Sequence, residues 1–278
     1  MAMRKLLLGL LFVFGQMPLA SAQLINHVSP ERASADEIRD TARLVEARKA
    51  DRTRPPEGYQ ALYYVTERTT TLFKDPSFTE PYIELKRRDP VYLVDKEYSL
   101  AEVRTKDGVR GYLPSSHISN VWIRISKSER TAYVYKGGEL LKEIPADVGY
   151  NAFADKSRRG GNNRDLWRTP EGRFFVVGKN PNSKYYKAFV LNYPNTEHAE
   201  RGLKSNLITA AQYRAIVEAE KRSEWPPMNT PLGGMIEIHG NGTNARANWT
   251  QGCVALTDQM MDELLPIVEI GTPVLIEP

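Results

Sequence analysis

Short runs of alternating apolar and polar residues, separated by turn residues, fill most of the chain after residue 57 and predict a mainly β protein. In residues 58–120 the strand-like runs are 62–65, 82–85, 91–94, 101–105 and 110–113. The Asp107-Gly108 pair between the last two runs is a strong signal for a tight hairpin. Several short strands in so short a segment predict a small β-barrel over residues 58–120.

The β pattern continues through residues 121–278, which we predict to be a second, β-sandwich-like domain. Its first expected strands are 121–125, 131–135 and 140–148. Residues 198–230 interrupt this pattern with apolar positions that suit one or two helices. We interpret 198–230 as an insertion that caps a cleft, and a helix packed on the surface is the alternative.

The last part of the chain predicts a short helix followed by a strand. Thr257 is a suitable N-cap residue. Four apolar residues then fall on one helix face, which we assign to the core rather than to a cofactor site: Met260, Met261, Leu264 and Leu265. Residues 271–273 form a turn into the final strand, 274–276.

The beginning of the chain reads as an export signal. Arg4 and Lys5 precede a short apolar run, and a small-residue cleavage site ends at Ala22, so we predict a cleaved signal peptide over residues 1–22. Residues 23–57 predict a short exposed helix and a proline-containing linker. The expected location is therefore periplasmic or otherwise extracytoplasmic, with no stable membrane insertion after signal removal.

Composition narrows the class of partner. The sequence is 41% hydrophobic and 26% charged, which supplies a core, and its net charge of +4 suits an anionic cell-wall polymer. Export and the absence of a clustered basic and aromatic pattern argue against nucleic acid. One cysteine and four scattered histidines give no metal-ligand spacing, so we expect no metal and no cofactor.

The single cysteine, Cys253, is better explained by chemistry than by packing, because an exported free thiol risks oxidation and has no internal disulfide partner. His239 ends one expected strand, a polar loop follows over residues 241–248, and Cys253 begins the next strand. This order predicts that the loop brings the imidazole within reach of the thiol, as an activated nucleophile requires. Taken singly, a buried structural cysteine and a structural histidine are the alternatives.

Residues around the cysteine suit acyl transfer. Gly252 allows a sharp bend and close approach of a substrate. The amides of Gly252 and Cys253 are candidate donors to an oxyanion. Thr250 and Trp249 add a hydroxyl and a flat apolar wall, and we assign both to substrate binding.

These motifs resemble the L,D-transpeptidase catalytic domain of the YkuD type, whose pattern is His-Gly, a loop, and Ser/Thr-x-Gly-Cys. Here the pattern is His239-Gly240 and Thr250-Gln251-Gly252-Cys253. Further segments are similar to one branch of that family: 168–174, 180–186 and 191–195. Residues 58–120 are similar to a bacterial Src-homology-3-type domain, a module that often contacts the cell wall.

The resemblance implies acyl transfer on peptidoglycan stem peptides, in cell-wall biogenesis and cell shape. Cys253 would be the nucleophile, His239 the base, and Gly240 the carbonyl that holds the imidazole. An imidazolium partner would lower the pKa of the thiol. Many members carry an arginine where this chain has Ala255, so we expect Arg246 or Arg168 to bind the stem carboxylate.

Two alternatives stay open at this level. The same Cys/His pair suits an L,D-carboxypeptidase or an amidase that acts on cross-links or on wall-anchored proteins. A non-catalytic wall-binding protein, in which the barrel binds and the second domain is inert, is the other. Asn248 stands where the branch usually carries aspartate. This difference concerns the choice of the acyl acceptor rather than the identity of the nucleophile.

Overall fold

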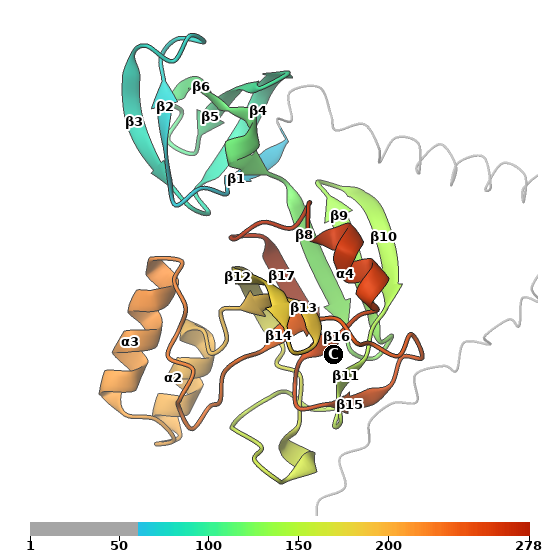
Figure 1. Cartoon of the computed structure of the whole chain (residues 1–278). Helices are drawn as coiled ribbons and strands as arrows, with labels where there is room; N and C mark the ends of the chain where they lie inside the picture. The colour runs from blue at the N-terminus through green and yellow to red at the C-terminus, as the bar shows by residue number, and fades with distance from the viewer. Residues whose placement is uncertain (1–60) are drawn as a thin grey trace, which may run out of the picture. The chain divides into compact units, whose positions relative to one another are not determined.

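The computed structural model describes residues 61–278 (Figure 1). The predicted signal peptide (1–22) and helical segment with its linker (23–57) lie outside the described residues and stay predictions. Within the described part, no helix has the length and apolar character needed to cross a membrane.

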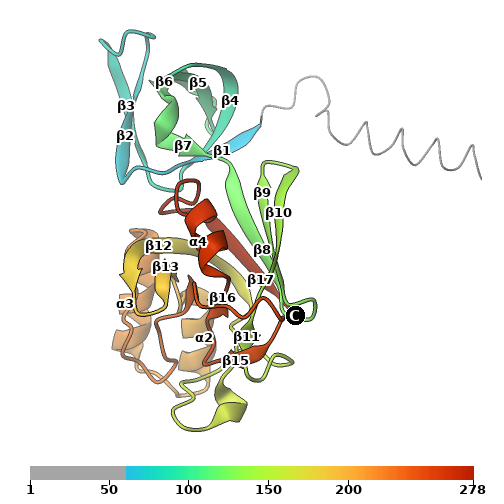
Figure 2. The same ribbon diagram turned by 45° about the vertical axis from the view of Figure 1, so that its right-hand side comes forward.

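Residues 62–119 form a seven-stranded antiparallel sheet in the order β3-β2-β6-β5-β4-β1-β7. Figures 1 and 2 show this sheet curled, and its buried apolar side chains, among them Leu72 and Val103, form a core. The elements are β1 (Leu62–Val65), β2 (Thr69–Phe73), β3 (Pro81–Lys86), β4 (Pro90–Glu97), β5 (Leu100–Thr105), β6 (Arg110–Pro114), the 3-10 turn η1 (Ser115–His117) and β7 (Ile118–Ser119).

The five strands predicted for this region are confirmed, and Gly108 turns the β5–β6 hairpin at φ 87°. Strand β2 was missed because its sequence begins with three threonines. Two of its side chains nevertheless face inward: Leu72 is fully buried, and the Thr70 hydroxyl lies 2.8 Å from Nδ1 of His117. The resemblance to a Src-homology-3-type domain and a wall ligand for it stay predictions.

Residues 121–277 build the second sheet, in the order β10-β9-β8-β17-β12-β13-β14-β16. A separate parallel pair joins β11 to β15. The strands are β8 (Val121–Ser126), β9 (Thr131–Lys136), β10 (Glu139–Pro145), β11 (Val148–Gly149), β12 (Gly172–Ser183), β13 (Tyr186–Leu191), β14 (Glu237–His239), β15 (Asn248–Thr250), β16 (Val254–Ala255) and β17 (Pro273–Glu277).

Strand β12 connects the two halves of this sheet. Its first residues, 172–175, pair with β17, and its later residues, from Val176 onward, pair with β13. The largest core cluster draws buried side chains from both halves, among them Ile123, Phe189 and Ile238. The mainly β class is therefore confirmed, with strands far apart in sequence sharing one core.

Four helical segments accompany this sheet in the described part of the chain: η2 (Arg164–Leu166), α2 (Thr196–Lys204), α3 (Ala210–Lys221) and α4 (Asp258–Leu264). Helices α2 and α3 lie side by side and have a small core of their own, which includes Ala199 and Ile216 (Figures 1 and 2). As predicted, the Thr257 hydroxyl caps α4, and Met261 and Leu264 are fully buried.

Candidate active site

The histidine and the cysteine come from neighbouring strands. Strands β14 and β16 pair in parallel, with Ile238 opposite Val254 and His239 opposite Ala255. His239 is thus the last residue of β14, and Cys253 immediately precedes β16. Parallel strands need a crossover connection, and the polar loop with β15 provides it here. The expected order of strand, polar loop and strand is confirmed, and the reach of the imidazole to the thiol stays a prediction.

Both side chains open onto one cavity of about 710 Å³. Its wall also includes Trp249, Glu237 and Lys156. A volume of this size lies in the usual range for ligand clefts, which is several hundred cubic ångströms. The thiol is therefore reachable by a ligand rather than enclosed in the hydrophobic core.

The His239 ring is held from three sides. Its Nδ1 lies 2.7 Å from the Gly240 carbonyl oxygen, so Nδ1–H donates there and Nε2 is the free nitrogen of the neutral ring. The Tyr185 ring stacks on it at 4.4 Å between centroids, and Trp249 meets it edge-on at 6.2 Å. Burial lowers the pKa of His239, and the bond to Gly240 opposes this shift. The resting imidazole is therefore neutral near pH 7.

The thiol is also neutral at rest. In the described part of the chain its hydrogen-bond acceptor is the Met235 carbonyl, 3.5 Å from Sγ, rather than the His239 ring. Burial raises the pKa of Cys253 to about 11. The lowered thiol pKa that the resemblance implies is therefore not supported for the resting site, because burial penalises the charged forms of both Cys253 and His239.

A buried carboxylate organises the loop that joins His239 to Trp249. Asp147 is 1% exposed and accepts four hydrogen bonds of 2.7–2.9 Å. Its donors are the Thr243 amide and hydroxyl, the Ala247 amide and Trp249 Nε1. Burial opposes the charged form, but these bonds together hold the pKa of Asp147 below its usual range. Asp147 was missed because the expected strand 140–148 ran through it; in the structure β10 ends at Pro145 and Asp147 precedes β11.

The polar groups of the turn before Cys253 hydrogen-bond to one another. The Thr250 hydroxyl donates to the Cys253 carbonyl at 2.6 Å and accepts from the Gly252 amide at 3.2 Å. The Gly252 amide is therefore occupied, and the expected oxyanion donor at this residue is not free in the resting state. Thr250 lines the cavity, but its hydroxyl shapes the turn. A substrate-binding role for Thr250, Gly252 and Trp249 stays a prediction.

The two arginines expected to bind a carboxylate face elsewhere. Arg246 Nε lies 3.4 Å from the Thr131 hydroxyl. Arg168 donates to the backbone carbonyls of Asp165 and Asp155 at 2.6 and 3.4 Å. Neither arginine lines the cavity among the described residues, so the assignment of Arg246 to this site is not supported.

Three other cations line the cavity instead: Lys156, Arg159 and Lys184. Sequence reasoning missed them because they stand in polar turns that read as solvated surface. The Asn248 side-chain oxygen accepts a hydrogen bond of 2.6 Å from Arg130 Nε, so this residue still acts as a hydrogen-bond acceptor in place of the usual aspartate.

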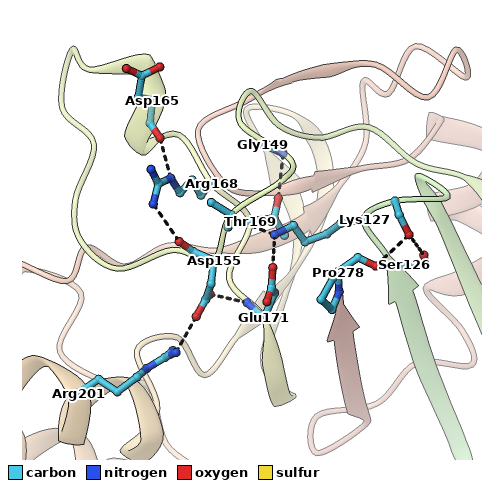
Figure 3. A network of polar contacts seen from close by, with 12 residues as sticks. Ser126, Lys127, Gly149, Asp155, Asp165, Arg168, Thr169, Glu171, Arg201 and Pro278 are labelled. Carbon is cyan, nitrogen blue, oxygen red and sulfur yellow. Dashed lines mark hydrogen bonds and ion pairs between the residues drawn. The ribbon is translucent and has the colours of Figure 1, made fainter. Parts of the chain in front are cut away.

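Polar contacts fasten the loop between β11 and β12, which carries Lys156 (Figure 3). The Asp155 carboxylate accepts from the Glu171 amide at 2.8 Å and from Arg201 at 2.7 Å. The fully buried Lys127 binds the Glu171 carboxylate and the Ala154 carbonyl. These contacts anchor both ends of the segment that forms one cavity wall.

Helices α2 and α3 contribute no residue to the cavity wall, although Met228 from the segment after them does. The cap predicted for residues 198–230 is therefore not supported for the helices, which fit the packed-surface alternative. Within residues 61–278, no three acidic, histidine or cysteine side chains gather so as to hold a metal ion.

Comparison with known proteins shows which protein family the chain resembles. The sequence model of the L,D-transpeptidase catalytic domain family, YkuD, matches residues 120–276. A search of curated protein sequences found no match.

Among solved structures, an L,D-transpeptidase from Xylanimonas cellulosilytica is 17% identical with a TM-score of 0.35, and the match covers 57% of this chain and 61% of that one. The helical cell shape determining protein Pgp2 from Campylobacter jejuni is 21% identical with a TM-score of 0.37, over 57% of this chain and 47% of that one. An L,D-transpeptidase from Mycobacterium smegmatis is 16% identical with a TM-score of 0.35, over 77% and 84%.

This chain thus spans less than two thirds of the length of the first two structures. The family match covers more than half of the chain and includes the His239 and Cys253 strands. The chain belongs to the YkuD family of L,D-transpeptidase catalytic domains.

Proposed function

We propose that this protein is an L,D-transpeptidase that cross-links or modifies extracytoplasmic peptidoglycan through a thioester on Cys253. The observation that carries the proposal is the placement of His239 at the end of β14 and of Cys253 just before the parallel neighbour β16, with both at the wall of one cavity. Family membership supports the reaction class. The Gly240 carbonyl supports the role of His239, because it leaves Nε2 free to accept a proton.

The first half-reaction forms the thioester. The Cys253 proton moves to Nε2 of His239 as Sγ attacks the carbonyl carbon after the L-centre of the third stem residue. The tetrahedral intermediate then collapses, the carbon–nitrogen bond breaks, and the leaving D-alanine amine takes the proton from His239. The acyl group stays on sulfur.

The second half-reaction transfers the acyl group. An amine of another stem attacks the thioester carbon and gives its proton to His239. The carbon–sulfur bond breaks, and the returning proton restores the neutral thiol. Water in place of the amine gives hydrolysis by the same steps, so the accepting nucleophile decides between transferase and carboxypeptidase.

The neutral resting pair has a consequence for the rate. Because burial raises the pKa of Cys253 to about 11 and lowers that of His239, little thiolate exists before substrate binds. Proton transfer must then accompany attack, with His239 acting as a general base rather than as half of a standing ion pair.

Intact-mass spectrometry with a carbapenem tests the proposal. We expect the wild-type protein to gain the mass of one inhibitor molecule, and Cys253→Ala to gain none. His239→Ala should acylate at least a hundredfold more slowly, as is typical for loss of a general base. A matched control is His117→Ala, because His117 lies in the 3-10 turn η1, between β6 and β7, and is bonded to Thr70.

The outcome also separates the alternatives. An unmodified wild-type protein would favour a non-catalytic wall-binding role. With acylation established, incubation with purified peptidoglycan and mass analysis of the digested fragments distinguishes new cross-links from shortened stems. Shortened stems alone would identify the protein as a hydrolase.

A further inference from the structure

Lys156 is a buried cation at the wall of the candidate active site. It is 5% exposed and lines the cavity shared by Cys253 and His239. The preceding residue, Asp155, is fastened to the Glu171 amide and to Arg201 (Figure 3). The loop therefore holds the lysine inward instead of leaving it in solvent, where a flexible cationic side chain is most stable.

The ammonium group of Lys156 has no carboxylate partner at ion-pair distance among the described residues. Its Nζ donates to the Gln251 carbonyl at 3.2 Å, and the nearby Asp155 carboxylate is paired with Arg201. Nζ also lies 3.3 Å from the position that a Cβ on Gly252 would occupy. The charge is thus placed directly against the turn that carries the nucleophile.

Such a charge is costly to bury without a partner. Burial lowers the pKa of Lys156 to about 8, with Arg168 and Arg159 adding to the shift and Cys253 and Asp155 opposing it. A buried cation in a cleft, beside a group that becomes negative during a reaction, is the arrangement expected of a functional residue.

The thiol is the group that needs such a cation. Among the charged groups that face Cys253, the buried Glu237 disfavours the thiolate, whereas Lys156 and Lys184 favour it. Lys184 is exposed and lies over the Tyr185 ring at 4.7 Å, so solvent screens its charge. Neutral His239 offers no charge before it takes the proton. Lys156 is thus the buried cation that acts on the sulfur.

The geometry points to Lys156 as a further residue of the acyl-transfer site, whose ammonium stabilises the negative charge that forms on Cys253 Sγ when the thiol proton moves to His239. This role deepens the proposed function and rests on it, since it acts on the same nucleophile. Lys156 thereby supplies a cation at the cavity that neither Arg246 nor Arg168 lines. The Gln251 carbonyl fixes where the ammonium sits, and the charge supplies the effect.

Alkylation of the thiol by iodoacetamide tests the role without any peptidoglycan. The neutral reagent is attacked by the thiolate, iodide leaves, and the rate against pH reports the ease of ionisation. For Lys156→Met we expect about a tenfold slower alkylation at pH 7, which corresponds to a rise of about one unit in the thiol pKa. Lys156→Arg should stay near the wild-type rate, because it keeps the charge.

Two further variants control for packing and for general cationic charge. Lys156→Gln keeps a hydrogen-bond donor but loses the charge, and it should slow alkylation as the methionine variant does. Lys184→Met removes the exposed cation of the same cavity and should change the rate by less than about twofold, because solvent screens it. Thermal melting separates this role from a structural one: removing an uncompensated buried charge should leave the melting temperature equal or higher.

Repeating the measurement with iodoacetate, an anionic reagent, checks the nature of the ammonium's partner. Parallel slowing with both reagents supports stabilisation of the thiolate. An unchanged iodoacetamide profile in both Lys156→Met and Lys156→Gln overturns the inference, and slowing with iodoacetate alone overturns it in favour of carboxylate binding. The test is independent of the proposed reaction: a protein that alkylates as expected but forms no carbapenem adduct refutes the proposed function and leaves the Lys156–thiol interaction standing.

Discussion

Replacing Asp147 with asparagine should loosen the loop that connects His239 to Trp249. Each carboxylate oxygen of Asp147 accepts two hydrogen bonds: Oδ1 from the Thr243 hydroxyl and the Ala247 amide, and Oδ2 from the Thr243 amide and Trp249 Nε1. Asparagine has the same shape but only one acceptor oxygen. Whichever way the amide is turned, its NH₂ group faces two donors.

The expected cost follows from the two lost bonds. At about 1.5 kcal/mol for each hydrogen bond to a charged group, Asp147→Asn should lower the free energy of unfolding by about 3 kcal/mol. For a domain of roughly this size, that corresponds to a melting temperature lower by about 6–12 °C. A loosened loop should also hold less firmly the Trp249 ring that meets His239 edge-on, so acylation by a carbapenem should slow.

Circular dichroism during heating measures the effect, and its pH dependence identifies the cause. Because the folded state holds the pKa of Asp147 below its usual value, the stabilisation is present above the unfolded pKa, about 4, and is lost as pH falls through the folded pKa. The difference between wild type and variant should therefore be full at pH 7 and shrink below pH 4.

The matched control is Asp258→Asn, which acts on the same loop from an exposed position. Asp258 Oδ1 accepts one hydrogen bond of 2.7 Å, from the Asn241 amide. Its replacement should cost less than about 1 kcal/mol. A melting temperature for Asp147→Asn within 1 °C of wild type at pH 7 would refute the reasoning, because four donors cannot lose half of their acceptors at no cost.

Three other substitutions probe charge, backbone and burial. Glu237→Gln removes the carboxylate that disfavours the thiolate and should speed iodoacetamide alkylation about threefold at pH 7, a shift of half a pKa unit; a slower rate would contradict the assigned sign. Gly252→Ala should lower the free energy of unfolding in urea by about 3 kcal/mol, because φ is 137° and the added Cβ would lie 2.6 Å from the Arg168 carbonyl oxygen. Wild-type stability would show that the turn relaxes freely. Lys127→Met leaves Glu171 without its buried partner and should cost about 3 kcal/mol, whereas the double replacement with Glu171→Gln should recover part of that loss.

A local pattern was enough to predict most strands and to single out His239 and Cys253 as the candidate pair. Alternating apolar residues predicted the strands of residues 62–113. Strand β2 was not predicted, because its inward residue Thr70 is polar. The order histidine, loop, cysteine predicted two strands joined by a loop, and the structure adds that these strands, β14 and β16, are parallel neighbours. The carbonyl expected to hold the imidazole is found at Gly240, 2.7 Å from the ring, and its catalytic role stays part of the proposal.

Long-range contacts determined the charges around that pair. Arg246 stands near the cysteine in sequence, yet it reaches the Thr131 hydroxyl, whereas Lys156 stands almost a hundred residues away and lines the same cavity. Nothing in the run Lys156-Ser157-Arg158-Arg159 distinguishes a buried lysine from a solvated one. The difference arises from Asp155, which is tied to Arg201 and to the Glu171 amide.

The strand pattern, the candidate nucleophile and its expected histidine could be predicted from the sequence alone, because each prediction depends on residues close together along the chain. Contacts between distant segments were needed to see that Asp147 holds the loop, that Lys156 lines the cavity of Cys253, and that burial disfavours the charged forms of both His239 and Cys253. The physical reason is that burial and Coulomb interactions depend on distance in space. Segments far apart in sequence set those distances, and no local pattern encodes them.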